Sequence, residues 1–397
     1  MRSTQPSTEL IHHRYEAPDG FAAPQLPVHK ASTVIFPNAA AMRGRDWRSK
    51  AGYTYGLHGT PTTFALEERI ATLEGGLHCV LVPSGLAAVT LVDMALLQAG
   101  DELLLPSNVY GPSRAFAHAE LARWGISHRL YDPMDVSSLA AAIGPSTRLV
   151  WLEAAGSVTM EFPDLHALVR TARERGVLTA LDNTWGAGLA FDGFALGIDV
   201  VMQALTKYPS GGGDVLMGSV TTRDAALHER LLGCHMRLGL GVGANDCEFV
   251  LRSLHSLPVR YQAHDAAARQ LAHWMAGRTE VVQVLHPALA GSPGHSHWRA
   301  TCTAAAGLFS VVFDERYSAA QIDGFVDALR LFKIGFSWAG PMSLVVPYDI
   351  AQLRPQSPGT NANPHGQLVR FSIGLEEPAA LQADLAQALV CLAADSG

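Results

Sequence analysis

The sequence predicts an α/β fold in which a doubly wound domain with a mainly parallel sheet is joined to a smaller α+β domain. Short apolar runs alternate with helical patterns from about residue 60 to about residue 230, which is typical of consecutive βαβ units. After a long helical pattern, the later strands and helices lose this alternation. The 397 residues exceed what one hydrophobic core usually serves, so at least two domains are expected.

The first fifty or so residues are polar and irregular, and only the stretch STVIFPN at 32–38 has the composition of a strand. Such a segment buries little by itself, so we expect it to lie against another subunit. The first helix of the α/β domain is expected to begin at Pro61 and to end at Gly75 and Gly76, because proline favours the start of a helix and glycine its end.

The first strand–turn–helix unit contains a candidate anion-binding turn. The strand HCVLVP runs into Ser84, Gly85 and Leu86, and an Ala- and Leu-rich helix continues to Leu97. At the start of a helix, N–H groups without acceptors and the helix dipole favour an anion such as phosphate. Ser84 is also a common N-cap residue, so a plain helix cap is the alternative.

Two further strands lead to polar residues. The run DELLLP is followed by Tyr110 in a loop, and LVWLEAAGS contains Glu153 and ends at Ser157. A tyrosine in such a loop is either ordinary surface or a group that stacks on an aromatic cofactor or moves a proton. The next helix is expected over 163–176.

The strongest candidate chemistry follows two apolar runs in the middle of the chain. The runs at 177–181 and 200–205 are too short for helices and rich in branched residues, so they indicate buried strands. The first leads to Asp182, and the second leads to Thr206 and Lys207. Because an open parallel sheet binds ligands at the carboxyl ends of its strands, Asp182 and Lys207 should share one crevice.

A lysine and an aspartate in one crevice suggest pyridoxal 5'-phosphate (PLP). The lysine would hold the cofactor aldehyde covalently, and the carboxylate would keep the pyridine nitrogen protonated, so that the ring accepts electrons. The alternative is an ordinary ion pair at the ends of two strands.

A long helical pattern begins at about Asn245 and pauses at Pro258, and we place a domain boundary near it. The expected divisions are an N-terminal arm that contacts a neighbouring subunit (1–58), a PLP-binding α/β domain (59–252) and a C-terminal α+β domain (253–397). In the last of these, Arg370 lies in an alternating strand. An edge-strand arginine is normally solvated, but its planar guanidinium suits a substrate carboxylate if it faces the cleft.

Composition argues against several functional classes. The net charge of −7 disfavours nucleic acid or an anionic membrane as partner, and the most apolar stretch, 80–97, is too interrupted for a membrane span. The five cysteines are scattered and the N-terminus lacks a signal-peptide core, so a cytoplasmic location is expected. His295 and His297 form the best histidine pair, but no carboxylate or cysteine stands at ligand spacing, so no metal is expected.

These motifs together resemble the transsulfuration family of PLP-dependent enzymes, which contains cystathionine lyases and synthases and methionine γ-lyase. The resemblance extends from about Thr33 to Leu392, and its most specific marks are YTYGLHGTPTTFALEERIATLEGG, SGLAA, LDNTWGAG and TKYPSGGGD. Within the family, EAAGSVTME and SWAG are most similar to the bacterial cystathionine β-lyases, because the γ-enzymes usually carry leucine where this chain has Trp338.

The resemblance implies the fold type I architecture, with a mainly parallel seven-stranded sheet, and roles for individual residues. Lys207 would hold PLP and remove the substrate Cα proton, Asp182 would contact the pyridine nitrogen, and Tyr110 would stack on the ring and help protonate the departing thiolate. Further cofactor contacts would come from Gly85, Leu86, Thr206, Ser157 and, from the neighbouring subunit, Tyr55. Substrate contacts would come from Arg370, Ser337, Trp338 and Tyr55. A homo-oligomer with shared active sites, a dimer of dimers, is therefore implied.

Two positions depart from the family pattern. Leu57 stands where the family has the arginine of a Tyr-x-Arg phosphate motif, so one expected cation is missing, and Gly212 replaces the histidine of Gly-His-Ser-Asp. A charge-assisted contact is worth about 1.5–3 kcal/mol, so cofactor affinity should fall unless another cation compensates. His58 and the arginines of the 42–48 stretch are the candidates.

The resemblance implies a carbon–sulfur β-lyase that converts the amino acid L-cystathionine to homocysteine, pyruvate and ammonia, a reaction of methionine biosynthesis. The alternatives are another reaction on the same scaffold, namely γ-elimination, γ-replacement or cysteine desulfhydration, and a non-catalytic PLP-fold binding protein. Trp338 and EAAGSVTME favour β-elimination over the γ-reactions.

Overall fold

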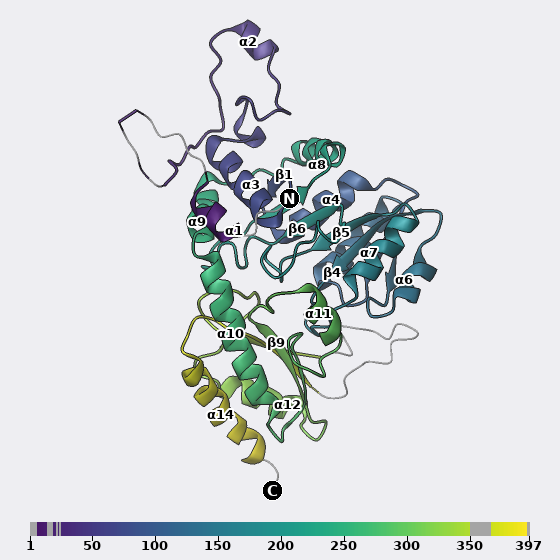
Figure 1. Cartoon of the computed structure of the whole chain (residues 1–397), viewed down its shortest axis with the longest axis vertical. Helices are drawn as coiled ribbons and strands as arrows, with labels where there is room; N and C mark the ends of the chain where they lie inside the picture. Colours follow the sequence, from purple (N-terminus) through teal and green to yellow (C-terminus); the bar gives the residue numbers. More distant parts are fainter. Residues whose placement is uncertain (1–5, 14–18, 21–22, 24, 350–366, 395–397) are drawn as a thin grey trace.

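The computed structural model describes residues 6–13, 19–20, 23, 25–349 and 367–394. It contains two sheets, each with its own helices, and the long helix α10 (Leu257–Ala276) runs alongside the second sheet (Figure 1). The stretch that carries the short helix α2 (Ala39–Arg43) projects away from both. The domain divisions at 1–58, 59–252 and 253–397 stay a prediction.

The larger sheet is mainly parallel and seven-stranded, as predicted. Its strand order is β1-β7-β6-β5-β4-β2-β3. Only β7 runs antiparallel to its neighbours, and the other pairs are parallel. The strands are β1 (His78–Val82), β2 (Glu102–Pro106), β3 (Ser127–Tyr131), β4 (Thr147–Glu153), β5 (Leu178–Asp182), β6 (Val200–Gln203) and β7 (Gly218–Thr222).

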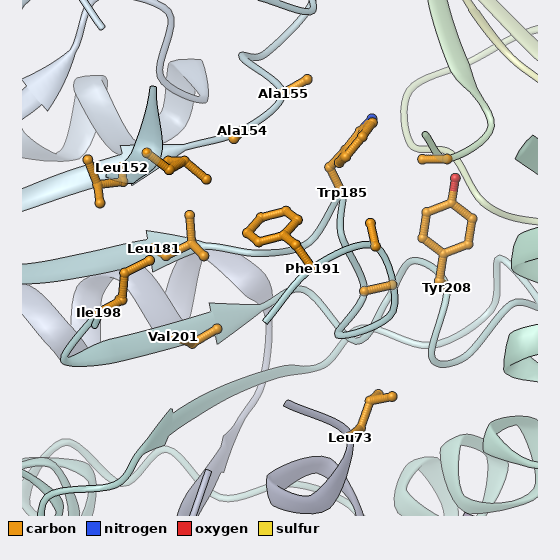
Figure 2. Close-up of a cluster of buried hydrophobic side chains, with 14 of the residues drawn as sticks. Leu73, Leu152, Ala154, Ala155, Leu181, Trp185, Phe191, Ile198, Val201 and Tyr208 are labelled. Carbon is orange, nitrogen blue, oxygen red and sulfur yellow. The ribbon is translucent and has the colours of Figure 1, made fainter. Parts of the chain in front are cut away.

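Helices cover both faces of this sheet, which explains the uninterrupted apolar runs of its strands. On β4, Leu152 belongs to one core and Trp151 to the other. Figure 2 shows part of the first core, where Leu152, Leu181 and Val201 come from three neighbouring strands. One face is covered by α1 (Pro6–Ile11), α3 (Pro61–Glu74), α6 (Val136–Ala142) and α7 (Leu165–Glu174), and the other by α4 (Gly85–Leu96), α5 (Gly111–Phe116) with its π-helical continuation η2 (Ala117–Leu121), and α8 (Ala225–Leu238).

The predicted limits of α3 are confirmed by its caps. Thr60 accepts a hydrogen bond from the Thr63 N–H, Pro61 lies in the first turn, and Gly75 ends the helix in the left-handed conformation with φ of 76°. A short 3-10 helix, η1 (Gly56–His58), precedes it.

The smaller sheet has the order β10-β11-β12-β9-β8 and is antiparallel except for the pair of β10 and β11. Helices α10, α12 and α14 share one apolar core with it. Among the described residues, no helix is both long and apolar enough to cross a membrane. The elements are β8 (Val281–Leu285), α11 (His295–Thr301), β9 (Leu308–Phe313), α12 (Ala319–Ala328), β10 (Lys333–Ile334), β11 (Leu344–Tyr348), β12 (Leu368–Ser372) and α14 (Pro378–Ala394).

The long helical pattern predicted from Asn245 is two helices, and the predicted pause is confirmed. Helix α9 (Ala244–Leu254) ends before His255, and α10 begins at Leu257 with Pro258 in its first turn. A proline is tolerated there because the first N–H groups of a helix have no intrahelical acceptor.

One expectation was wrong. The stretch 32–38 forms no strand: only Thr33 pairs, in an isolated bridge with Tyr55, and Ile35 is 85% exposed. Its composition favours a strand, but no described strand lies beside it to complete a ladder. The alternative of a solvated edge-strand arginine does not apply to Arg370, because β12 is the middle strand of its sheet and Arg370 is only 8% exposed. An alternating pattern indicates a strand but not its distant partners.

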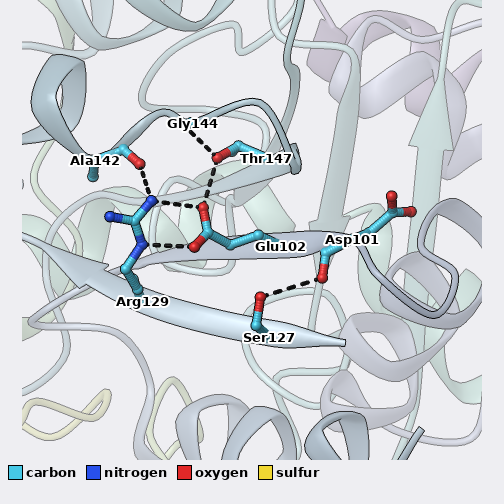
Figure 3. A network of polar contacts seen from close by, with 7 residues as sticks. All are labelled: Asp101, Glu102, Ser127, Arg129, Ala142, Gly144 and Thr147. Carbon is cyan, nitrogen blue, oxygen red and sulfur yellow. Dashed lines mark hydrogen bonds and ion pairs between the residues drawn. The ribbon is translucent and has the colours of Figure 1, made fainter. Parts of the chain in front are cut away.

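Side chains at the amino ends of β2 and β4 form a hydrogen-bonded network with the edge strand β3 (Figure 3). Arg129 on the edge strand β3 donates two hydrogen bonds to Glu102, from Nε at 2.6 Å and Nη2 at 2.8 Å. Thr147 donates to the same carboxylate at 2.7 Å. The hydrogen bond from Arg129 is the main cause that lowers the pKa of Glu102. This network ties the edge strand to the sheet, at the end opposite to the polar residues that follow the strands.

Replacing Asp384 with alanine is expected to destabilise the smaller sheet and its helices. The buried Asp384 carboxylate on α14 accepts the N–H groups of Arg330 at 3.0 Å and Leu331 at 2.7 Å, just after α12. An unsatisfied buried donor costs about 1–3 kcal/mol, so the thermal unfolding midpoint of Asp384→Ala should fall clearly below that of the exposed control Asp323→Ala. Equal midpoints would contradict this role.

Candidate active site

A cavity of about 490 Å³ lies where β2, β4, β5 and β6 end, and the second sheet supplies part of its wall. Ten of the eleven predicted site residues line it, and the eleventh, Tyr55, does not. Tyr55 lies on the N-terminal arm, 48% exposed, with its ring centroid 5.8 Å from that of His58. The ten residues are Gly85, Leu86, Tyr110, Ser157, Asp182, Thr206, Lys207, Ser337, Trp338 and Arg370.

Lys207 lies in a turn that follows β6 and presents its amine to this cavity. Nζ donates to the Ser337 hydroxyl at 2.8 Å and lies 5.6 Å from the centre of the Trp338 ring. Burial, followed by the Arg370 charge, lowers the pKa of Lys207 to about 8, although Asp182 acts in the opposite direction. The neutral, nucleophilic form of this amine is therefore a minority near neutral pH, but far more populated than in an ordinary lysine.

The turn after Lys207 is fixed to the second sheet and to α10. The Tyr208 hydroxyl accepts the Gly307 N–H at 2.7 Å, and Arg260 on α10 donates to the Tyr208 carbonyl at 2.9 Å. The lysine is therefore held between the two sheets.

Asp182 is held by a residue that the sequence analysis did not single out. Thr184 donates to Oδ1 of Asp182 from its N–H at 2.9 Å and from its hydroxyl at 2.5 Å, and its hydroxyl accepts the Ala204 N–H at 2.9 Å. Both hydrogen bonds from Thr184 to Asp182 go to Oδ1, and Oδ2 receives no hydrogen bond from the described residues. Burial raises the pKa of Asp182 despite these bonds, so the carboxylate favours a cationic partner such as a protonated ring nitrogen.

The predicted strand, turn and helix start are present at the beginning of α4. Ser84 caps the helix by accepting the Ala87 N–H at 3.0 Å, and the first-turn N–H groups of Gly85 and Leu86 have no intrahelical acceptor. A Cβ at Gly85 would lie 2.6 Å from the Cβ of Ala204, so glycine allows α4 to approach the end of β6. The cap and the anion site are compatible, because they use different N–H groups.

Thr206 stands in the same cavity, but its hydroxyl is already engaged. It accepts the Met217 N–H at 3.0 Å and donates to the Met217 carbonyl at 3.2 Å. The second contact is long, so a phosphate oxygen can compete for that proton.

Tyr110 provides a phenol that stays protonated. It directly precedes α5, and its N–H donates to Oε2 of Glu153 at 2.8 Å. Burial, followed by the charges of Asp182 and Glu153, raises the pKa of Tyr110. The side chain is 43% exposed, so the phenol can still exchange protons with solvent. Glu153 therefore positions the Tyr110 loop, a contact that strand order alone did not predict.

Arg370 and Ser337 lie together at one corner of the cavity. Arg370 Nη2 donates to the Ser337 carbonyl at 3.4 Å, and its buried Nε has no hydrogen-bond partner among the described residues. Ser337 has φ of 87°, a left-handed conformation that is costly for a serine. An underused, buried guanidinium suits a bound carboxylate.

The two positions that depart from the family pattern lie outside this corner. Leu57 lines a separate hollow together with His58 and Lys50. Burial, followed by the Arg45 charge, lowers the pKa of His58. Arg48 lines the same hollow as Leu57, so an arginine does stand near the position of the missing one.

The histidine pair makes ordinary structural contacts. His295 Nδ1 lies 2.8 Å from the Pro287 carbonyl, and His297 Nδ1 lies 3.9 Å from an Asp164 oxygen. Across the described ranges, no three His, Cys, Asp or Glu side chains gather as a metal site would require.

Fold and site together place the chain among the PLP-dependent enzymes, because the lysine, the buried carboxylate and the anion-binding turn meet at strand ends in the arrangement that this cofactor needs. The chain belongs to the Cys/Met metabolism PLP-dependent enzyme family, whose family model matches residues 7–390.

Known proteins of this kind are similar over nearly the whole chain. The chain is 41% identical to a cystathionine beta-lyase of Bordetella avium, with 96% of each chain covered. It is 33% identical to the cystathionine beta-lyase MetC of Escherichia coli, with 97% of this chain and 98% of the relative covered. A solved structure, cystathionine gamma synthase of Xanthomonas oryzae in complex with aminoacrylate and cysteine, has a TM-score of 0.88 at 29% identity and covers 98% of each chain.

The Lys207 amine is expected to titrate near pH 8 in the cofactor-free protein, because its pKa is lowered to about 8. Below this pH the amine is protonated and unreactive, and above it the amine is neutral. The measurement is the rate of acylation of Lys207 as a function of pH, followed by peptide mass spectrometry, with the exposed Lys333 as internal control.

Arg370→Gln should move the Lys207 midpoint to higher pH, because the Arg370 charge lowers the pKa of Lys207. A midpoint near the ordinary lysine value of about 10.4 in the unmodified chain, or no movement in Arg370→Gln, would contradict this description of the site.

Proposed function

We propose that this chain is a carbon–sulfur β-lyase that cleaves L-cystathionine to homocysteine, pyruvate and ammonia. The observation that carries the proposal is that one cavity holds a partly neutral lysine amine and a tyrosine phenol that stays protonated. β-Elimination needs a base at Cα and an acid at the departing sulfur. The names of the Bordetella avium and Escherichia coli relatives support this choice of reaction and substrate.

The residues of the cavity fit PLP, which when bound supplies an electron sink for the charge that develops at Cα. Lys207 would hold the cofactor covalently. Asp182, kept in place by Thr184, would pair with the protonated ring nitrogen. Tyr110 would stack on the ring, and Ser157 would lie near the ring hydroxyl.

The phosphate would be bound from both subunits. The N–H groups of Gly85 and Leu86 and the Thr206 hydroxyl would hold it from one chain, and Tyr55 would reach it from the neighbouring chain. His58 or an arginine of the 42–48 stretch would replace the charge that Leu57 cannot supply.

The substrate would be oriented by its α-carboxylate, which Arg370 and the backbone around Ser337 and Trp338 would bind, with Tyr55 contributing from the neighbouring subunit. Lys207 would take the Cα proton, and the Tyr110 phenol would give a proton to the sulfur as the Cβ–S bond breaks. Homocysteine leaves as the thiol, and water then converts the remaining three-carbon fragment to pyruvate and ammonia. No oxidant or reductant is needed.

Other reactions on this scaffold are the competing proposals. γ-Elimination, γ-replacement and cysteine desulfhydration would use the same base and the same carboxylate site, and the Xanthomonas oryzae structure carries the name of a γ-synthase. Trp338 beside Lys207 and the EAAGSVTME stretch favour β-elimination. A non-catalytic PLP-fold protein would bind the cofactor poorly and show no turnover.

We also propose a cytoplasmic homotetramer, a dimer of dimers. The exposed position of Tyr55 outside its own cavity supports an active site shared between subunits. The free thiols of all five cysteines suit a reducing compartment.

Purified, PLP-loaded protein given L-cystathionine is expected to form pyruvate and homocysteine in equal amounts. Lys207→Ala should abolish both products, because it removes the base. Pyruvate, 2-oxobutyrate and free thiols are followed together in the same sample. Appearance of 2-oxobutyrate with cysteine would assign γ-elimination instead, and no product from correctly assembled, PLP-loaded protein would reject cystathionine as substrate.

Mixed oligomers of Lys207→Ala and Tyr55→Ala subunits are expected to regain activity that neither variant has alone. In a mixed dimer one of the two sites combines an intact Lys207 with an intact Tyr55, so activity should return to about a quarter of normal in the unselected random mixture and to about half in mixed dimers isolated on both tags. The two variants are co-expressed with different tags and purified on both tags in turn. Doubly tagged oligomers without activity would show that Tyr55 does not act across the interface.

A further inference from the structure

Tyr348 is a second tyrosine of the cavity, and none of the roles above includes it. It is the last residue of β11 and lines the cavity together with Arg370. The local sequence around Tyr348 does not indicate this position, because the segment that places it beside the site is β12, which begins at Leu368.

The pairing of β11 with β12 brings Tyr348 to Arg370. In this antiparallel pair Val346 stands opposite Arg370, and Tyr348 stands opposite Leu368. Residues two apart on a strand share a face, so Tyr348 and Arg370 are diagonal neighbours on one face of the sheet. The Arg370 guanidinium carbon lies 5.4 Å from the centre of the Tyr348 ring, within range of a cation–π contact.

The Arg370 guanidinium has unused hydrogen-bonding capacity. Its Nη2 makes a 3.4 Å contact with the Ser337 carbonyl, and its Nε has no partner among the described residues although the side chain is buried. Burial lowers the pKa of Arg370. Because the Tyr348 ring lies against this guanidinium and lines the same cavity, Tyr348 stands beside the group that would receive a carboxylate.

We propose that Tyr348 is a substrate-binding residue that completes the carboxylate site of Arg370. Its ring limits the orientation of the guanidinium, and its hydroxyl donates a hydrogen bond to the carboxylate that Arg370 binds. The ligand class is an amino acid with a free α-carboxylate. This inference rests on the proposed function only in assigning the α-carboxylate to Arg370, and it holds for any reaction of the cavity on an amino acid.

The test uses the PLP-loaded Tyr348→Phe protein and two probes that differ only in the carboxylate, L-alanine and L-alaninamide. Binding of each probe is measured by the change in cofactor absorbance, and KM and kcat are measured with L-cystathionine. Loss of one charge-assisted hydrogen bond should weaken L-alanine binding and raise KM about tenfold. Binding of L-alaninamide should not change, and kcat should change by less than about twofold.

Two further variants separate this role from a structural one. Tyr317→Phe is the matched control, because Arg316 also lies over the Tyr317 ring, at 4.9 Å, but Tyr317 does not line the cavity. It should leave both probes unaffected. Tyr348→Leu removes the ring as well and should weaken L-alanine binding further than Tyr348→Phe, again without an effect on L-alaninamide.

The outcomes distinguish this inference from the proposed function. Equal weakening of both probes in Tyr348→Phe, or no weakening of either, would overturn the role of Tyr348 in carboxylate binding. A fall in kcat with unchanged KM would overturn it as well. If the unmodified protein forms no pyruvate but Tyr348→Phe selectively weakens L-alanine, the proposed reaction fails and the carboxylate site stands.

Discussion

The parallel pairing of β5 with β6 is the constraint on which the site depends. Asp182 stands opposite Met202 in that pairing, and Lys207 follows β6 by a single turn. Because parallel strands end at the same edge of a sheet, the Asp182 carboxylate and the Lys207 amine reach one cavity without any long loop. Leu181 and Val201 in one core and Ala180 and Val200 in the other fix this register, since a slip by one residue would move every apolar side chain to the wrong face.

Burial then gives these groups the protonation states that the chemistry needs. Desolvation lowers the pKa of Lys207 and raises that of Tyr110, so the enclosed cavity favours a neutral base and a neutral acid. Arg370 reinforces the first effect and Asp182 the second. The residues proposed to bind the substrate and the cofactor therefore also shift the pKa values of the proposed base and acid.

The second sheet also contributes to the site. Tyr348 and Arg370 come from its strands, Ser337 and Trp338 come from the loop between β10 and β11, and the Lys207 amine is hydrogen-bonded directly to Ser337. The contacts of Tyr208 with Gly307 and Arg260 hold the two parts together close to the lysine. A change in how the two sheets pack would therefore shift Lys207 and Arg370 relative to each other. A mutation that destabilises this interface should for that reason also lower activity.

The sequence by itself determined the sheet type, the approximate limits of α3, α4 and α7, and the strand ends that carry Asp182, Lys207 and Tyr110, because these depend on local periodicity and on glycine and proline. Resemblance to a family added the substrate corner at Ser337 and Trp338. Only the tertiary structure decided that Arg370 lies on a central strand, that 32–38 forms no strand, and that Thr184, Glu153 and Tyr348 support the site. Each of these depends on which distant segments pair or pack together, and a local pattern contains no information about such partners.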